Sequence, residues 1–170
     1  VKLSEMSQTL IDAVVAGEDR SYFRHAGVDP TGIARALYQD VRGSGVQQGG
    51  STITQQYVKN VYLTSERTIT RKMKEAAIAL KLERKFSKAE ILERYLNEVY
   101  FGRSAYGVAA AARTYFGKEA SQLDVAETAY LAARQAFEDG VALRMTDKTK
   151  GNQLIEEEIE QLRDSVKLFQ

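Results

Sequence analysis

The chain has 170 residues, of which 44% are hydrophobic and 28% are charged, and its formal net charge is +1. This length predicts one domain with its own core, and the composition excludes an intrinsically disordered chain. Cysteine is absent and His25 is the single histidine, which excludes disulfide frameworks, cysteine nucleophiles and zinc sites built from several histidines. The charge balance gives no indication of a nucleic-acid partner.

Helical spacing of apolar residues extends over most of the chain, and we therefore predict a mainly α fold. A first helix is predicted over residues 10–17. A second helix is predicted to begin at Asp29, with Pro30 in its first turn. A third follows two glycines and is capped by Ser51 or Thr52.

A long helix is predicted over about residues 66–85. Its apolar positions share one face and are Ile69, Met73, Ala76 and Leu80. Ser87 and Glu90 have the spacing of a capping box, and the helix that they open has an apolar face from Ile91 to Val99.

The last predicted helices differ in character. An alanine-rich helix over residues 108–116 is ended by Gly117, which is typical of a left-handed C-cap. Another helix is predicted to begin at Ser121 or Asp124 and to end at about Ala133. Residues 153–170 carry five acids and two bases and have the apolar spacing of an amphipathic helix. A short hairpin is allowed at residues 42–50 or 100–106.

Two adjacent carboxylates, Glu18 and Asp19, follow the first predicted helix, with Tyr22, Phe23 and His25 close behind. Aromatic walls raise the pKa of a carboxyl by desolvation, which suits a general acid or base near neutral pH. The alternative interpretation is a solvated helix end, which composition alone favours. We expect His25 to be a structural hydrogen-bonding residue rather than a catalyst.

The glycines before the third helix expose backbone N–H groups at its positive end, where anions such as phosphate bind. Ser51, Thr52 and Gln55 add neutral donors there, and Lys59 adds a positive charge. The order of residues is not that of a Walker loop. The alternative is an ordinary loop and N-cap.

A basic stripe is the third candidate for chemistry. Arg67, Arg71 and Glu75 are spaced by four residues, and Lys72 lies beside them. Residues 59–74 contain five bases and one acid, an excess that indicates an anionic ligand such as pyrophosphate. A solvated face with an Arg71–Glu75 pair is the alternative.

These patterns occur in an order that resembles the peptidoglycan glycosyltransferase domain, glycosyltransferase family 51. The family includes class A penicillin-binding proteins and monofunctional glycosyltransferases. Four of its five motifs are intact over about residues 1–133: Glu-Asp-Arg from residue 18, Gly-Gly-Ser-Thr-Ile-Thr-Gln-Gln from residue 49, Arg-Lys-x-x-Glu from residue 71, and Lys-x-x-Ile-Leu-x-x-Tyr-Leu-Asn from residue 88. The resemblance implies a lysozyme-like helical lobe with a smaller, membrane-proximal jaw lobe.

The fifth motif departs from the family pattern. The family has a proline-containing connector and an arginine-rich helix after the segment that ends here at Ala133, whereas Pro30 is the only proline of this chain. Residues 134–170 therefore form an atypical C-terminal segment and receive no role from the resemblance.

The resemblance implies that glycan strands are elongated from lipid II. The acceptor 4-hydroxyl attacks C1 of MurNAc with inversion, a β-1,4 bond forms and undecaprenyl pyrophosphate leaves. Glu18 is then the general base, with Asp19 beside it in the motif. Glu75 is the second catalytic carboxylate, near the pyrophosphate, where it orients arginines or binds a divalent cation such as Mg²⁺ or Mn²⁺. No organic cofactor is implied.

Substrate-binding residues come from the motifs and the basic stripe. The bases fit a diphosphate clamp, because guanidinium and ammonium groups suit phosphate oxygens; they are Lys59, Arg67, Arg71 and Lys72. By the resemblance, the neutral side chains that line the cleft are Ser51, Thr52, Gln55 and Asn97. A lysozyme-like hydrolase or a catalytically impaired precursor-binding module are the alternatives to the transferase.

The implied partners are lipid II and the growing strand, an anionic membrane surface, and a phosphoglycolipid inhibitor such as moenomycin. The expected location is the extracytoplasmic face of the bacterial cell membrane, with an anchor just before Val1. No apolar run reaches the roughly 20 residues that a membrane span needs. We expect exposed apolar side chains on the jaw, with core packing as the alternative, at Val46, Tyr57, Val58, Val61, Tyr62 and Leu63.

Overall fold

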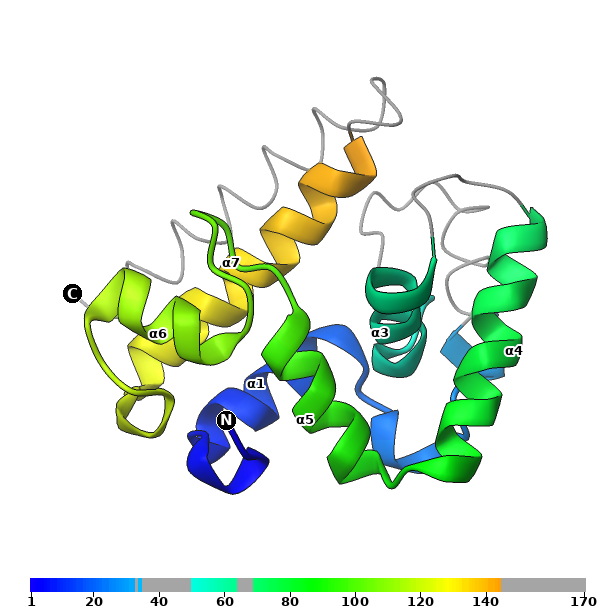
Figure 1. Cartoon of the computed structure of the whole chain (residues 1–170), viewed down its shortest axis with the longest axis horizontal. Helices are drawn as coiled ribbons and strands as arrows, with labels where there is room; N and C mark the ends of the chain where they lie inside the picture. Colours follow the sequence, from blue (N-terminus) through cyan, green and yellow to red (C-terminus); the bar gives the residue numbers. More distant parts are fainter. Residues whose placement is uncertain (33, 35–49, 64–68, 145–170) are drawn as a thin grey trace.

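The computed structural model describes residues 1–32, 34, 50–63 and 69–144 (Figure 1). Its helices, in chain order, are η1 (Leu3–Glu5), α1 (Gln8–Glu18), η2 (Tyr22–Arg24), α3 (Ile53–Tyr62), α4 (Ile69–Lys85), α5 (Lys88–Glu98), α6 (Val108–Phe116), η3 (Ala120–Gln122) and α7 (Val125–Arg144). The described residues add one isolated antiparallel bridge, between Tyr100 and Tyr106, and the mainly α class is confirmed. The predicted tail helix, and the part of the predicted jaw stretch before residue 50, lie outside the described residues.

The core forms where α1 packs against α7 and where α3 packs against α4 and α5. In Figure 1, α6 and α7 lie at one end of the molecule and α4 lies at the other, with α3 and α5 between them. Fully buried side chains from these helices include Leu10, Ile53, Tyr95 and Leu131. This core fixes the position of α3, whose N-terminal end contacts the candidate site residues of α1 and α4.

Local sequence signals set several helix ends as expected. Thr52 is the N-cap of α3 and Ser87 is the N-cap of α5, and each forms a capping box with the residue three positions on. α6 ends at Gly117, which has φ of 66° and is left-handed. Pro30 begins a helical turn, as predicted. α7 differs from its prediction, because it continues past Ala133 to Arg144.

The face of α4 that carries its apolar residues is its outer face. Met73 is 69% exposed and Leu80 is 40% exposed, whereas Glu75 and Ala79 are buried. The predicted apolar face of α4 is therefore exposed at Met73 and Leu80. The inward side of the helix carries Glu75, which pairs with Arg71 and Lys72, together with the buried Ala79.

The apolar residues proposed for the jaw surface divide between core and surface. Tyr57 and Val58 are buried, so their placement on an exposed jaw was wrong, because α3 turns them toward the core. Val61 and Tyr62 are exposed, and Val46 lies outside the described residues. Within the described ranges, no helix combines the length and apolarity that a membrane crossing requires.

Candidate active site

The N-terminal turn of α3 connects the end of α1 with α4. Residues 51–56, which we call the α3 entry segment, contact the acidic end of α1 and a base of α4. Gln56 bonds to Glu18, the backbone N–H of Ile53 bonds to Asp19, and Ser51 bonds to Lys72 of α4. The sequence motifs at residue 18, residue 49 and residue 71 are thus joined in space at this segment.

Glu18 is the last residue of α1 and its side chain is half-buried. Its carboxylate accepts a hydrogen bond of 2.7 Å from the side-chain amide of Gln56. The Gln56 amide oxygen in turn accepts from the phenol of Tyr95, at 3.3 Å, and Gln135 of α7 donates to the same phenol at 2.9 Å. A neutral amide therefore orients Glu18, and the chain of contacts behind it reaches into the core.

Asp19 is buried and is held by a different set of donors. Nε2 of His25 lies 2.9 and 3.0 Å from its two oxygens, and the Ile53 N–H donates to Oδ2 at 3.1 Å. His25 is thus a hydrogen-bonding partner of Asp19, and its structural role stays a prediction. Because Ile53 is the first residue of α3, the Asp19 carboxylate also lies at the positive end of that helix.

The loop between η2 and Pro30 is fixed by Asp29. Its carboxylate accepts from the Ser21 hydroxyl at 2.6 Å and from both the backbone N–H and the hydroxyl of Thr31. These bonds, that from Ser21 most of all, hold the pKa of the Asp29 carboxyl well below its usual range. The Thr52 hydroxyl donates to the Gly27 carbonyl at 2.7 Å, which ties the same loop to α3.

Glu75 is buried on the inward face of α4 between two bases. Nη1 of Arg71 lies 3.3 Å from one carboxylate oxygen, and Nζ of Lys72 contacts the other. Lys72 also donates to the Ser51 hydroxyl at 2.8 Å. Arg71 is mostly buried and Lys72 is half exposed, so the cluster presents positive charge next to the α3 entry segment.

The predicted divalent cation finds no ligand set in the described part of the chain. No group of three or more His, Asp or Glu side chains there could hold a metal ion. Both oxygens of Glu75 face cationic side chains, which would repel Mg²⁺ or Mn²⁺. The described residues therefore do not fit a metal at Glu75, and the cation stays a prediction.

A further carboxylate of α4, whose side chain is largely covered, escaped the sequence analysis. Glu83 of α4 accepts from the Thr54 hydroxyl and from Nζ of Lys88, both at 2.6 Å. Lys88 lies 4.3 Å from the centre of the Tyr22 ring, and the Tyr22 phenol donates to the Lys88 carbonyl. Burial raises the pKa of this phenol well above its ordinary value. The Glu83–Lys88 spacing of five residues across a helix break gave no signal in sequence.

Most predicted site residues gather around the α3 entry segment. Glu18, Asp19 and Ser51 do so through the bonds above, as do Arg71, Lys72 and Glu75. Thr52 and Gln55 form the capping box and are buried. Gln56, which links Glu18 to the core, was not singled out in sequence.

For three predicted binding residues, no described bond connects them to the α3 entry segment. Asn97 bonds to Val1 and to the Glu93 carbonyl, at the C-terminal end of α5. Lys59 lies in the last turn of α3 and is partly exposed. Arg67 lies outside the described residues.

Comparison with known proteins assigns the chain to a family. The family model for transglycosylases matches residues 1–152, and the chain therefore belongs to the transglycosylase family. This confirms the resemblance to the peptidoglycan glycosyltransferase domain and identifies the class of enzyme.

Curated relatives agree with the family. Penicillin-binding protein 1A of Haemophilus influenzae is 52% identical over 132 residues, and penicillin-binding protein 1A of Aquifex aeolicus is 50% identical over 133 residues. Penicillin-binding protein 1F of Bacillus subtilis is 46% identical over 133 residues. Each comparison covers 78% of this chain but only 16%, 18% and 19% of the respective relative. The chain thus spans less than a fifth of the length of these relatives.

Proposed function

We propose that this domain polymerises lipid II into β-1,4-linked glycan strands, with inversion at C1 of MurNAc and release of undecaprenyl pyrophosphate. The observation that carries the proposal is that the α3 entry segment contacts both ends of the required chemistry. At one end Gln56 bonds to Glu18, and at the other Ser51 bonds to Lys72, which pairs with Glu75. Attack by a hydroxyl on a sugar diphosphate needs a base and a group of cations close together.

Glu18 is the general base of this proposal. Its carboxylate accepts a hydrogen bond from the Gln56 amide, which orients it, and an ionised carboxylate can accept a proton from a hydroxyl. The proton of the acceptor 4-hydroxyl passes to Glu18 while the oxygen forms a bond to C1 of the donor. The bond from C1 to the phosphate oxygen breaks, and the leaving diphosphate keeps its electron pair.

Arg71 and Lys72 stabilise the charge that develops on the leaving group. Lys72 is half exposed, and its ammonium contacts both Ser51 and Glu75, so it is held at the surface of the site. Glu75 orients the two bases, since each of its oxygens faces one of them. Lys59 and Arg67 belong to the same clamp by the sequence argument.

Asp19 acts in this proposal by positioning. Its carboxylate joins His25 to the first N–H of α3, and Gln56 lies one turn further along that helix. The bonds of Asp19 therefore hold the end of α1 against α3, so that the Glu18 carboxylate stays within hydrogen-bonding distance of the Gln56 amide.

The remaining parts of the proposal follow from the lipid-linked substrate. The domain works at the extracytoplasmic face of the cell membrane, next to an anionic lipid surface. Its partners are lipid II and the growing strand, and a phosphoglycolipid such as moenomycin competes for the site. Family membership and the basic cluster at Arg71 and Lys72 support these assignments.

The test is incubation of the chain with lipid II and analysis of all products. We expect a polymer that a muramidase cuts to disaccharide units, with one undecaprenyl pyrophosphate released per bond formed. Cleavage of preformed glycan without polymer would instead indicate the hydrolase. Binding of lipid II without turnover would indicate a precursor-binding module, and either result would contradict the proposal.

A further inference from the structure

A series of hydrogen bonds connects α7 with the carboxylate of Glu18. Nε2 of Gln135 donates to the phenol of Tyr95 at 2.9 Å, and this phenol donates to Oε1 of Gln56 at 3.3 Å. Nε2 of Gln56 donates to Glu18 at 2.7 Å. Gln135 and Tyr95 are fully buried, whereas Gln56 and Glu18 are half-buried. We call these four side chains the Glu18 network, which runs from the core to the candidate site.

The bonds of the Glu18 network have one direction. An ionised carboxylate only accepts, so the amide of Gln56 turns its NH2 group toward Glu18 and its oxygen toward Tyr95. The single hydrogen of the Tyr95 phenol is then directed at Gln56, and the phenol oxygen accepts from the NH2 group of Gln135. Each donor therefore fixes the orientation of the next side chain in the network.

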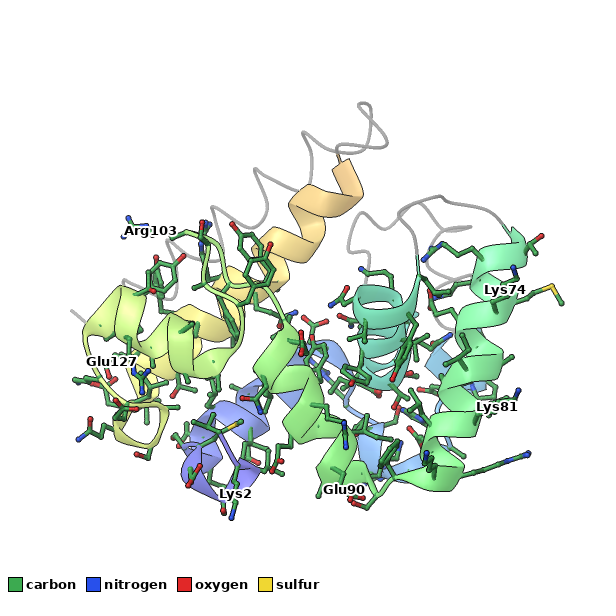
Figure 2. All side chains as sticks on the ribbon, in the orientation of Figure 1. Lys2, Lys74, Lys81, Glu90, Arg103 and Glu127 are labelled. Atoms are coloured by element: carbon green, nitrogen blue, oxygen red, sulfur yellow. The ribbon has the colours of Figure 1, made fainter. Side chains whose placement is uncertain are left out.

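Gln135 belongs to the part of α7 that the motifs did not predict. The helix was expected to end at about Ala133, but it continues to Arg144. α7 packs against α1, and α3 packs against α5, where Figure 2 shows side chains of both helices meeting between them. The network thus connects the atypical C-terminal segment, through α5 and α3, with the last residue of α1.

We propose that Gln135 and Tyr95 are positioning residues for the base of the transfer reaction. Tyr95 acts on the amide of Gln56 directly, and Gln135 acts through Tyr95. The terminal torsion of a glutamine is broad and roughly two-fold, so without the Tyr95 donor the amide could turn its oxygen toward Glu18. The carboxylate would then lose the donor that orients it. The inference rests on the proposed function, in which Glu18 is the base.

Solvent exchange of the Gln56 side-chain amide tests the network without any substrate. The amide resonance in the NMR spectrum is assigned by its loss in Gln56→Met. Tyr95→Phe removes the donor to Oε1, and the amide protons should then exchange about fivefold faster, as the loss of one neutral hydrogen bond implies. Gln135→Met keeps most of the volume but removes the donor to Tyr95, and exchange should be about twofold faster.

Turnover of lipid II shows whether this orientation matters for the reaction. Tyr95→Phe should lower kcat by about tenfold and Gln135→Met by about threefold, because a misplaced base reacts slowly. KM should stay within about twofold in both, since neither change removes a substrate contact. The double variant should match Tyr95→Phe alone, because Gln135 acts through Tyr95 and the two losses are therefore not additive.

Tyr115→Phe is the matched control for the loss of a phenol. The phenol of Tyr115 also donates to a carbonyl, that of Phe101 at 2.8 Å, and accepts from a side chain of α7, that of Arg134 at 3.2 Å. The guanidinium of Arg103 lies 5.4 Å from the centre of its ring, and Figure 2 labels Arg103 on the side of the molecule that holds α6, away from α3. The control should lose thermal stability, while Gln56 exchange and turnover stay within about twofold.

The outcomes separate the inference from a purely structural role and from the proposed function. Unchanged Gln56 exchange in Tyr95→Phe, or a fall in kcat no larger than that of the control, would overturn the inference. Additive losses in the double variant would overturn the role of Gln135 through Tyr95. A wild-type chain that does not polymerise lipid II would refute the proposed function, whereas faster exchange in Tyr95→Phe would still support the orientation of Gln56 toward Glu18.

Discussion

Replacement of Asp19 tests how the loop after α1 is fixed to α3. The carboxylate is buried and accepts from His25 and from the Ile53 N–H, at 2.9–3.1 Å. Alanine removes the acceptor from a buried backbone N–H and from the imidazole. A hydrogen bond to a charged group contributes about 1.5–3 kcal/mol, so the free energy of unfolding should fall by about 3–5 kcal/mol. In a domain of this size that corresponds to a decrease in Tm of roughly 6–20 °C.

Asp19→Asn separates the charge from the shape. The asparagine oxygen can still accept from the Ile53 N–H, but its amide group turns toward Nε2 of His25. His25 would then have to accept there, and its Nδ1 is buried with no partner among the described residues. We expect a smaller loss, of about 1–2 kcal/mol, from the weaker neutral bonds.

Thermal and urea unfolding of the wild type and both variants give these values. Asp12→Ala is the matched control, because Asp12 is exposed on α1 and pairs only at the surface, with Gln8. Its loss should stay within about 0.5 kcal/mol. The reasoning fails if Asp19→Ala costs no more than this control.

The remaining predictions each concern the surroundings of a single residue. Gly27 has φ of 84° and a Cβ there would lie 2.9 Å from the Ala79 carbonyl, so Gly27→Ala should lower the free energy of unfolding by at least about 2 kcal/mol. Gly17→Ala, with open space and a helical position, should raise it by about 0.5–1 kcal/mol, and chemical denaturation of the pair checks both signs. The pKa of the Asp29 carboxyl is lower in the folded protein than in the unfolded chain, so this group stabilises the fold above the unfolded pKa of about 3.9, and the stabilisation is lost as the pH falls below that value. The free energy of unfolding of Asp29→Asn should therefore decrease less steeply below about pH 4 than that of the wild type. An unchanged slope in acid unfolding would contradict this. Lys72→Met should weaken binding of a phosphoglycolipid by about 10- to 150-fold while binding of a neutral disaccharide stays constant, and calorimetry that finds equal losses would show that Lys72 only supports the fold.

Local signals explain why much of the fold could be predicted. The capping boxes at Thr52 and Ser87 and the glycine at 117 each specify a helix end through bonds within one turn. The face from Ile91 to Val99 is buried as expected, and Leu92, Leu96 and Val99 pack into the hydrophobic core. These features need only neighbouring residues, and a single sequence contains them.

The exposure of Met73 and Leu80 on α4 has a physical cause at the candidate site. Apolar spacing indicates the inward face of a helix only when its interior neighbours are apolar as well. The interior side of α4 instead holds Glu75, which pairs with Arg71 and Lys72 of the same helix, and Glu83, which bonds to Thr54 and Lys88. Of these partners only Thr54 is distant in sequence, and conflicts between apolar spacing and polar burial concentrate at functional sites.

The same limit applies to Gln56 and Asn97. Gln56 was one of several polar residues in its motif, and its bond to Glu18 depends on how α1 and α3 pack. Asn97 was predicted from its motif to line the cleft, but its described partners are Val1 and Glu93. The carboxylates themselves could be identified from the motifs, while the residues that orient them could not.

The central claim is that Glu18 is the base of a transferase whose leaving group is held separately by the α4 cluster. The most direct measurement is the turnover of lipid II by Glu18→Gln together with its affinity for the same substrate, with Glu98→Gln, an exposed change at the end of α5, as the control. Because glutamine keeps the shape and can still bond to Gln56, affinity should stay within about twofold while turnover falls by roughly 10²-fold or more, and the control should match the wild type. Turnover of Glu18→Gln near the wild-type rate would contradict the claim.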